Sequence, residues 1–261
     1  MRRSIPVLVV LLSICVPEIA QTPESDDALM SKARALYDAP FTRNLAAFDC
    51  EIQFDWKAHF LAMLGTMPPA AVATAEKLQT IHHRISLDGH KATVSSKPEK
   101  PDFNGVPQGA KLEEVLIAMV SSGLNAWLPS STNVVLPVGT TKYQFEKLPS
   151  GFKVLMTDDH VKGTLLLDAD LRVASGEIEL PQPMSFTTEF KSGPQGYVLS
   201  SIRTGPPPND AAFAYTYQSV DGFQLPAEIT VTPATTGEWQ YRLTDCKVVK
   251  FVKLQVGLPK Q

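Results

Sequence analysis

The three cysteines of this 261-residue chain have the side chains best suited to chemistry: Cys15, Cys50 and Cys246. Cys50 lies in the stretch FDCEIQFDW, where apolar and polar residues alternate as they do in a strand with one buried face. A cysteine in that position can be a small apolar residue, a reactive thiol or half of a disulfide. Cys50 and Cys246 each follow an aspartate in a predicted strand, one early and one late in the chain.

The histidines do not suggest a metal site. In a hairpin with a two-residue turn at 88–89, Leu87 would pair with His90, and His83 would pair with Val94. His83 and His90 would then share a face but lie too far apart to bind one ion without a third group. We therefore expect hydrogen-bonded strand histidines and no metal ligands.

One acidic cluster deserves a test for catalysis. The stretch TDDHVKG contains Asp158, Asp159 and His160, which could supply a general base and a carboxylate that orients it. Its position between two strand signals favours an exposed turn instead. The chain also lacks a Gly-x-Ser-x-Gly elbow, a phosphate-binding glycine loop, a His-Glu-x-x-His motif and a Cys-x-x-Cys motif. We expect no catalytic residues, no cofactor and no enzymatic activity.

The N-terminus has the layout of a secretory signal peptide. Two arginines precede a short apolar run, and Ala20 follows it, which predicts removal of residues 1–20 and leaves 21–261 as a single β-rich domain. Lipid attachment at Cys15 is disfavoured because Ile14 stands where a small residue is expected. No later segment is long and apolar enough to span a bilayer, so we expect no transmembrane segment in the mature chain. We therefore expect an exported protein. We interpret its location as periplasmic, and association with the outer membrane is the alternative.

The charge balance excludes some partners. A formal net charge of −3 gives no basic surface for nucleic acid or for an anionic membrane. A hydrophobic content of 44% is ordinary for a globular protein, so a substantial core is available.

Helical patterns are confined to the first half of the chain. Residues 25–37 predict a short amphipathic helix with Ser25 as its cap, and residues 57–79 predict two helical pieces, the second starting at Pro69. The strongest helical pattern covers residues 112–127, with an apolar stripe wide enough to lie buried on a sheet.

From residue 133 onward, short strand patterns recur with turn residues between them, for example at 149–151, 193–196 and 221–222. Such short links predict antiparallel pairing. We predict an α+β fold in which about 10–12 antiparallel strands form a strongly curved sheet, an incomplete barrel, with helices packed on its concave face.

A surplus of large apolar side chains could either fill a closed core or line a cavity for an apolar ligand. Helices and strands both contribute, and the candidate ligand-binding residues are Phe60, Met63, Leu116, Met119, Trp127, Phe186 and Phe190.

The last predicted strand carries Lys247, Lys250 and Lys253. They could contact an acidic partner, but we favour the interpretation that they keep an exposed edge strand from pairing with other chains.

Three stretches together resemble a known family. They are the helix followed by a strand at 25–56, the strand pair LLLDADLRVASGEIEL at 165–180, and YQSVDGFQLPAEITV at 217–231. This strand order is similar to that of the bacterial lipoprotein-carrier superfamily, the LolA-like and LppX-like proteins. The resemblance implies an unclosed antiparallel barrel covered by helices that holds lipid tails, and it transfers no individual residue. A carrier or sensor of a lipid or other apolar ligand is thus one hypothesis, and an envelope scaffolding module that binds another protein is the alternative.

Once Cys15 is removed, Cys50 and Cys246 form an even pair, which in an oxidising compartment predicts a disulfide. The bond requires the first and last strands to be neighbours. Trp239 and Phe251 fall on odd positions of the last strand, so strict alternation would turn Cys246 to the opposite face. Either a bulge near 244–245 turns Cys246 inward, or the bond closes on the other face, or there is none.

Overall fold

The computed structural model describes residues 24–106, 108–158, 162–179, 183–205, 210–234 and 237–251. Over these residues the fold is α+β, with one antiparallel sheet of twelve strands that does not close on itself and four α-helices. The predicted signal peptide, residues 1–20, lies outside the described residues.

The helices follow the predicted pattern closely. They are α1 (Asp26–Ala35), α2 (Trp56–Leu64), α3 (Pro69–Gln79) and α4 (Gly109–Ser131), with a short 3₁₀ helix at Pro40–Arg43. Ser25 caps α1 by accepting a hydrogen bond from the Ala28 N–H, and Pro69 opens α3, as predicted. Helix α4 extends about one turn beyond the predicted range at each end. None of the helices in the described part of the chain has the length and hydrophobicity needed to cross a membrane.

Alternation predicted the strands well, and the strands expected after residue 133 are present. The twelve strands are β1 (Leu45–Phe54), β2 (His82–Leu87), β3 (Ala92–Lys97), β4 (Lys142–Leu148), β5 (Gly151–Thr157), β6 (Lys162–Asp168), β7 (Val173–Glu179), β8 (Met184–Gly193), β9 (Gly196–Thr204), β10 (Ala211–Val220), β11 (Phe223–Pro233) and β12 (Trp239–Lys250).

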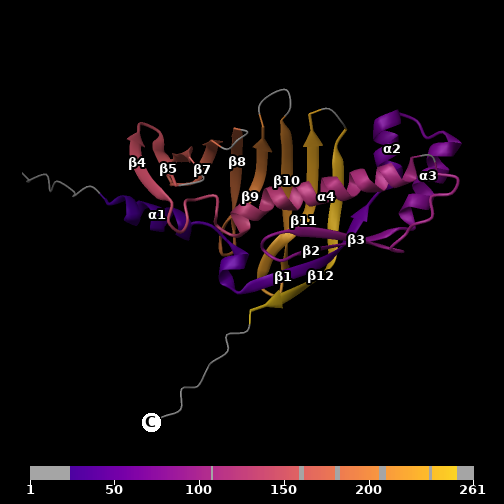
Figure 1. Ribbon diagram of the computed structural model, residues 1–261, viewed down its shortest axis with the longest axis horizontal. Coiled ribbons are helices and arrows are strands. Elements are labelled where there is room, and N and C mark those ends of the chain that lie inside the picture. The colour runs from indigo at the N-terminus through magenta and orange to yellow at the C-terminus, as the bar shows by residue number, and fades with distance from the viewer. Residues whose placement is uncertain are drawn as a thin grey trace, which may run out of the picture.

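The order of the strands explains the place of α4. The order is β3-β2-β1-β12-β11-β10-β9-β8-β7-β6-β5-β4, so the first strand of the chain pairs with the last, and β3 and β4 are the two edges. Helix α4 lies in the connection between these edges and must cross the sheet. At 23 residues it is about 35 Å long, and Figure 1 shows it lying across one face, called here the inner face.

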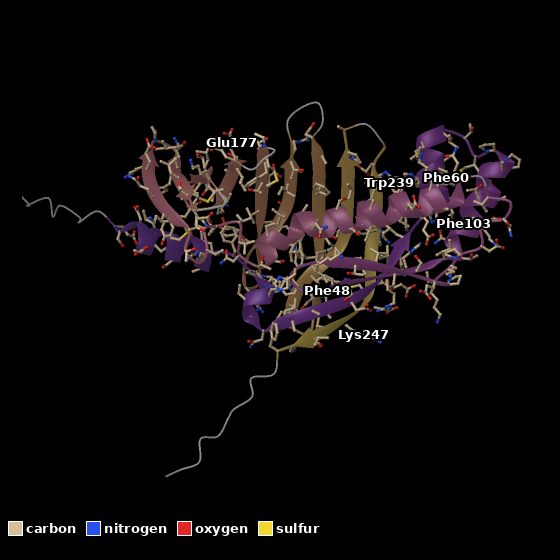
Figure 2. All side chains as sticks on the ribbon, viewed as in Figure 1. Phe48, Phe60, Phe103, Glu177, Trp239 and Lys247 are labelled. Atoms are coloured by element: carbon tan, nitrogen blue, oxygen red, sulfur yellow. A yellow bond between two sulfur atoms is a disulfide. The ribbon has the colours of Figure 1, made fainter. Side chains whose placement is uncertain are left out.

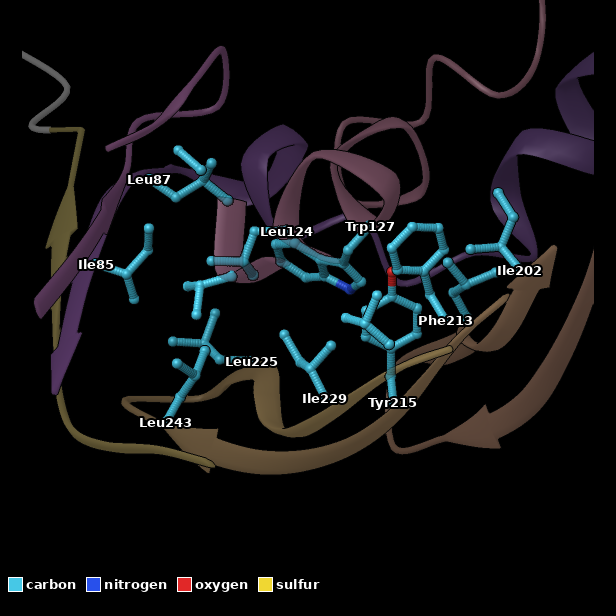
Figure 3. Packing of buried hydrophobic residues seen from close by; sticks show 14 of the residues in the cluster. Ile85, Leu87, Leu124, Trp127, Ile202, Phe213, Tyr215, Leu225, Ile229 and Leu243 are labelled. Atoms are coloured by element: carbon cyan, nitrogen blue, oxygen red, sulfur yellow. The ribbon is translucent and has the colours of Figure 1, made fainter. Parts of the chain in front are cut away.

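Two buried tyrosines fasten α4 to the inner face. The hydroxyl of Tyr215 donates to the carbonyl of Gly123 at 2.8 Å, and that of Tyr241 donates to the carbonyl of Val120 at 3.1 Å. A Cβ at Gly123 would lie 2.4 Å from the Tyr241 hydroxyl oxygen, so this close approach requires glycine. Around these contacts, side chains of the sheet point toward α4 (Figure 3).

The structure contains the predicted disulfide between Cys50 and Cys246, and it joins the neighbouring strands β1 and β12. The predicted bulge is also present: Asp49 pairs with Lys247 and Glu51 with Thr244, so two residues of β12 face Cys50. The bulge reverses which positions of β12 face inward. The buried residues before it have odd numbers, whereas Cys246 and Val248 pack against the core after it.

The predicted role of the lysines in the last strand depends on the partners of β12. Strand β12 lies between β1 and β11, but its pairing with β11 covers only residues 239–242, so Lys247 and Lys250 lie where β12 pairs with β1. Lys253 lies outside the described residues. The Nζ of Lys250 donates to the carbonyl of Asp221 at 3.3 Å. Protection of an edge by these lysines stays a prediction.

The hairpin between β2 and β3 has a four-residue loop in place of the predicted two-residue turn. Leu87 pairs with Ala92, and His83 pairs with Ser96. The carboxylate of Asp88 accepts hydrogen bonds from the main-chain N–H groups of the residues at positions 90 and 91, both at 3.0 Å, and thereby stabilises the longer loop.

Candidate functional site

Five of the seven predicted ligand-binding residues are divided between one helix and one strand. Leu116, Met119 and Trp127 are on α4, while Phe186 and Phe190 are on β8. Leu116 and Trp127 are buried in the core, and Met119 is half-buried against it. A Cβ at Gly176 of β7 would lie 2.4 Å from the ring of Phe186, which shows how closely this ring covers β7.

Phe190 packs against the residues that follow α1. Its ring contacts the ring of Tyr37 edge to face, with the ring centroids 4.8 Å apart. Beneath α4, the indole N–H of Trp127 donates to the Tyr217 hydroxyl at 3.0 Å, and that hydroxyl donates to the carbonyl of Leu199 at 2.7 Å. The inner face under α4 is therefore occupied by side chains that satisfy one another.

The two remaining predicted residues, Phe60 and Met63, are together on α2. Helix α2 begins within the stretch whose alternating apolar and polar residues predict a strand, because β1 ends at Phe54 and Trp56 already belongs to α2. Asp55 accepts a hydrogen bond from the Ala58 N–H at 2.9 Å and so acts as the helix cap.

An aromatic cluster forms where α2 meets the start of β12. Figure 2 places Phe60 and Trp239 at the same end of the molecule. The ring of His59 lies 4.1 Å from that of Trp239, and Phe54 stacks on Trp239 with ring centroids 5.4 Å apart. Trp56 packs edge to face against Phe54 at 4.8 Å. Residues nearly two hundred positions apart in the sequence thus build one wall.

Beside this cluster lies a pocket of about 330 Å³, called here the α2 pocket. It is lined by Phe54, Asp55, Ala58, His59, Ala62, Met63, Gly237, Glu238 and Gln240. Its volume is within the range of small-molecule sites, about 300–1,000 Å³. Met63 is 57% exposed, so the pocket reaches the surface at the end of α2.

His59 is one of four polar residues that line the α2 pocket, with Asp55, Glu238 and Gln240. Burial lowers the pKa of His59, and a hydrogen bond with the main chain of Glu238 opposes this shift in part. The imidazole is therefore neutral near pH 7, and its Nε2 is buried with no hydrogen-bond partner among the described residues. If the other ring nitrogen donates to the Glu238 main chain, Nε2 carries a lone pair and can accept a hydrogen bond.

Two larger hollows involve β1 and β2, and one of them shares Phe54, Asp55, Ala58 and Gln240 with the α2 pocket. Their volumes are about 710 and 990 Å³, and both are lined by Glu51 and His82. Some charged groups there are paired, as in the contact of Arg242 Nε with Glu228 Oε2 at 2.8 Å. Charged side chains from several strands thus line these hollows.

The other candidate residues do not form a catalytic or metal centre in the part of the chain that the structure describes. No group of three or more His, Cys, Asp and Glu side chains in that part could hold a metal ion. Asp158 accepts a hydrogen bond from the Thr141 hydroxyl at 2.9 Å, while Asp159 and His160 lie outside the described residues.

Sequence reasoning did not find the α2 pocket because its walls come from residues 54–63 and 237–240. The available local signal was His59, a titratable residue among the apolar residues 58–65. Comparison with protein-family models gives no match, and a search of curated proteins finds none with significant similarity.

Proposed function

We propose that this protein is exported and binds an apolar ligand in the α2 pocket as a carrier or sensor, without changing that ligand chemically. One observation carries the proposal: within a pocket of about 330 Å³, where Phe54, Ala58, Ala62 and Met63 supply the apolar part of the wall, a buried nitrogen of His59 has no hydrogen-bond partner among the described residues. An apolar ligand with one hydrogen-bond donor, such as a long-chain alcohol, would pack against the apolar walls and donate a hydrogen bond to that nitrogen.

The resemblance to the lipoprotein-carrier superfamily supports the same class of function. An unclosed antiparallel sheet with a helix across one face is compatible with it. We further propose that the sheet is a strongly curved, incomplete barrel, with α4 on its concave face. Because the side chains beneath α4 pack against one another, the ligand would lie beside α2. The disulfide and the predicted signal peptide support a periplasmic location.

The test is a fluorescence titration that uses the tryptophans of the aromatic cluster as probes. A long-chain alcohol should cause a saturable change, and Ala62→Phe, which fills the α2 pocket, should weaken binding about tenfold or more, or about 1.4 kcal/mol. The matched control is Ala70→Phe, an exposed position on α3 that does not line the pocket.

A second comparison isolates His59. The wild-type protein should prefer the alcohol over the alkane of equal length, and His59→Phe should remove that preference. Equal binding by wild type and Ala62→Phe, or no saturable binding of either compound, would exclude the α2 pocket as the ligand site.

The alternative function, an envelope scaffolding module, is favoured by one observation, the two large hollows that are both lined by Glu51 and His82. A pull-down from envelope extracts separates the two functions. A stable partner that is lost with Glu51→Arg and retained with Ala62→Phe would support the scaffold.

A further inference from the structure

We propose that the turn joining α2 and α3, residues 61–70 and called here the α2–α3 tip, inserts into the surface of a phospholipid bilayer. Every residue of the tip except Met67 is exposed, and Thr66 is its only residue with a polar side chain. The exposed fractions of the large side chains are 50% for Leu61, 57% for Met63 and 53% for Leu64. Figure 1 places α2 and α3 at one end of the molecule, with no other labelled element beyond them.

Charged residues are excluded from the tip and gather at its base. No Lys, Arg, Asp or Glu occurs from residue 58 to residue 75. At the base, Lys57 Nζ contacts Glu76 Oε1 at 2.9 Å and so links α2 to α3, while Lys77 Nζ lies 3.8 Å from Asp102 Oδ2. An apolar end with a collar of charges matches a segment whose end enters the acyl region while its base remains among the lipid headgroups.

The directions of the exposed side chains favour a bilayer over a protein surface. Successive helical residues are turned by about 100°, so Leu61 and Leu64 lie on one side of α2, about 60° apart, whereas Met63 is turned by about 100–160° away from them. One flat protein face cannot cover all three, whereas acyl chains can surround them. The rise from Ala58 to Leu64 is about 9 Å, which agrees with the depth of about 5–10 Å that interfacial helices reach.

The main chain of the tip is also suited to an apolar medium. The Gly65 N–H donates to the Leu61 carbonyl at 2.9 Å, and the N–H groups of Ala71 and Val72 donate to the Pro68 carbonyl at 2.9 and 3.1 Å. Residues 68 and 69 are prolines and have no N–H to satisfy. Few main-chain donors would therefore be desolvated without a partner.

This inference goes beyond the proposed function, although Ala62 and Met63 belong to both the tip and the α2 pocket. Ligand binding is measured without vesicles and bilayer binding without added ligand, so either proposal can fail while the other stands.

The experiment places an environment-sensitive dye on Met63→Cys in protein purified from an exporting host. Because Cys50 and Cys246 are bonded to each other, neither offers a free thiol to the dye. Vesicles of phosphatidylcholine should shift the dye emission to the blue, and lipids that carry a quencher in their acyl chains should quench it. The same dye on Leu166→Cys, an exposed position on β6, is the control and should show neither effect.

Two further arms make the result decisive. Leu61→Glu combined with Leu64→Glu should reduce vesicle binding about tenfold or more, while Leu155→Glu with Leu166→Glu, also at exposed leucines, should not. Because the tip is uncharged, adding phosphatidylglycerol or salt should change binding little. No dye response, binding lost in salt, or a dimer that the tip variant dissociates without any vesicle binding would overturn the proposal.

Discussion

His83 lies buried between β2, β3 and α4, with its Nδ1 3.0 Å from the hydroxyl oxygen of Ser96 and 4.0 Å from a carboxylate oxygen of Glu113. Burial lowers the pKa of His83, the charge of neighbouring His82 adds to this shift, and the Glu113 carboxylate opposes it. Ser96 and Glu113 therefore both lie near Nδ1 of His83, whereas its Nε2 has no hydrogen-bond partner among the described residues. The arrangement is thus a buried neutral imidazole, which has consequences for stability.

We predict that the protein loses stability as the pH falls below about 6.5. In that range the unfolded chain binds a proton at His83 that the folded chain does not, so the free energy of unfolding decreases. The decrease for one such group is at most about 1.4 kcal/mol per pH unit. His83→Gln should therefore reduce the slope of unfolding free energy against pH, measured by urea denaturation between about pH 7 and pH 5.

The matched control for that prediction is His90→Gln, because His90 is exposed in the loop after β2. In this control the slope of unfolding free energy against pH should equal that of the wild type. The His83 variant should keep a residual slope, because burial also lowers the pKa of His59. An unchanged slope in His83→Gln would contradict the assignment.

Single residues were predictable where a general rule applied to them. Cys50 and Cys246 were paired because an even number of thiols remains in an oxidising compartment. The environment of His83 was not predictable, because the hydrogen bonds of Asp88 lengthen the hairpin loop and shift the strand register by two residues. Glu113 approaches from a helix that local sequence cannot place.

At the scale of elements, the bulge in β12 decides which face of the strand is buried. Asp245 there has φ of 46°, in the left-handed region, and it stands with Cys246 opposite Cys50. Beyond the bulge, Val249 is 58% exposed and Phe251 is 64% exposed, although both continue the odd numbering of the buried residues before it.

We predict that Asp245→Val lowers the free energy of unfolding by about 1–2 kcal/mol, because a β-branched residue is strained at positive φ. Asp245→Gly should be tolerated at the same position. Denaturant unfolding of both variants checks this, with Lys247→Val as a control at an exposed position without positive φ. Equal losses in Asp245→Val and Lys247→Val would indicate that the bulge is not strained in this way.

Elements were largely predictable because a strand with one buried face has a period of two and a covered helix has a period near 3.6. The start of α2 was missed because Trp56 continues the alternation of β1, while Asp55 ends the strand by capping the helix. The α2 pocket lay beyond this kind of reasoning, since it needs the contact of α2 with residues 237–240.

For the whole molecule, the pairing of β1 with β12 determines the topology. Strands β4 to β12 follow one another in the sheet, and β1, β2 and β3 attach to this series through β12. The disulfide lies at that junction and joins residues 196 positions apart. Helix α4 closes the connection by crossing from the β3 edge toward the β4 edge (Figure 1).

We predict that Cys50→Ala with Cys246→Ala leaves the fold intact but lowers the free energy of unfolding by about 2–4 kcal/mol. The bond restricts the unfolded chain, and for so large a loop the chain-entropy model gives an upper limit of about 5 kcal/mol.

In the same double variant, amide exchange should accelerate most in β1, β2 and β3, because only the ladder to β12 and the contacts of α4 would still hold them. Oxidised wild type provides the reference, and processed protein denatured without reductant should show no free thiol. Two free thiols in that assay would contradict the bond, whereas uniform acceleration across the sheet would mean that β1 to β3 do not unfold as a separate unit.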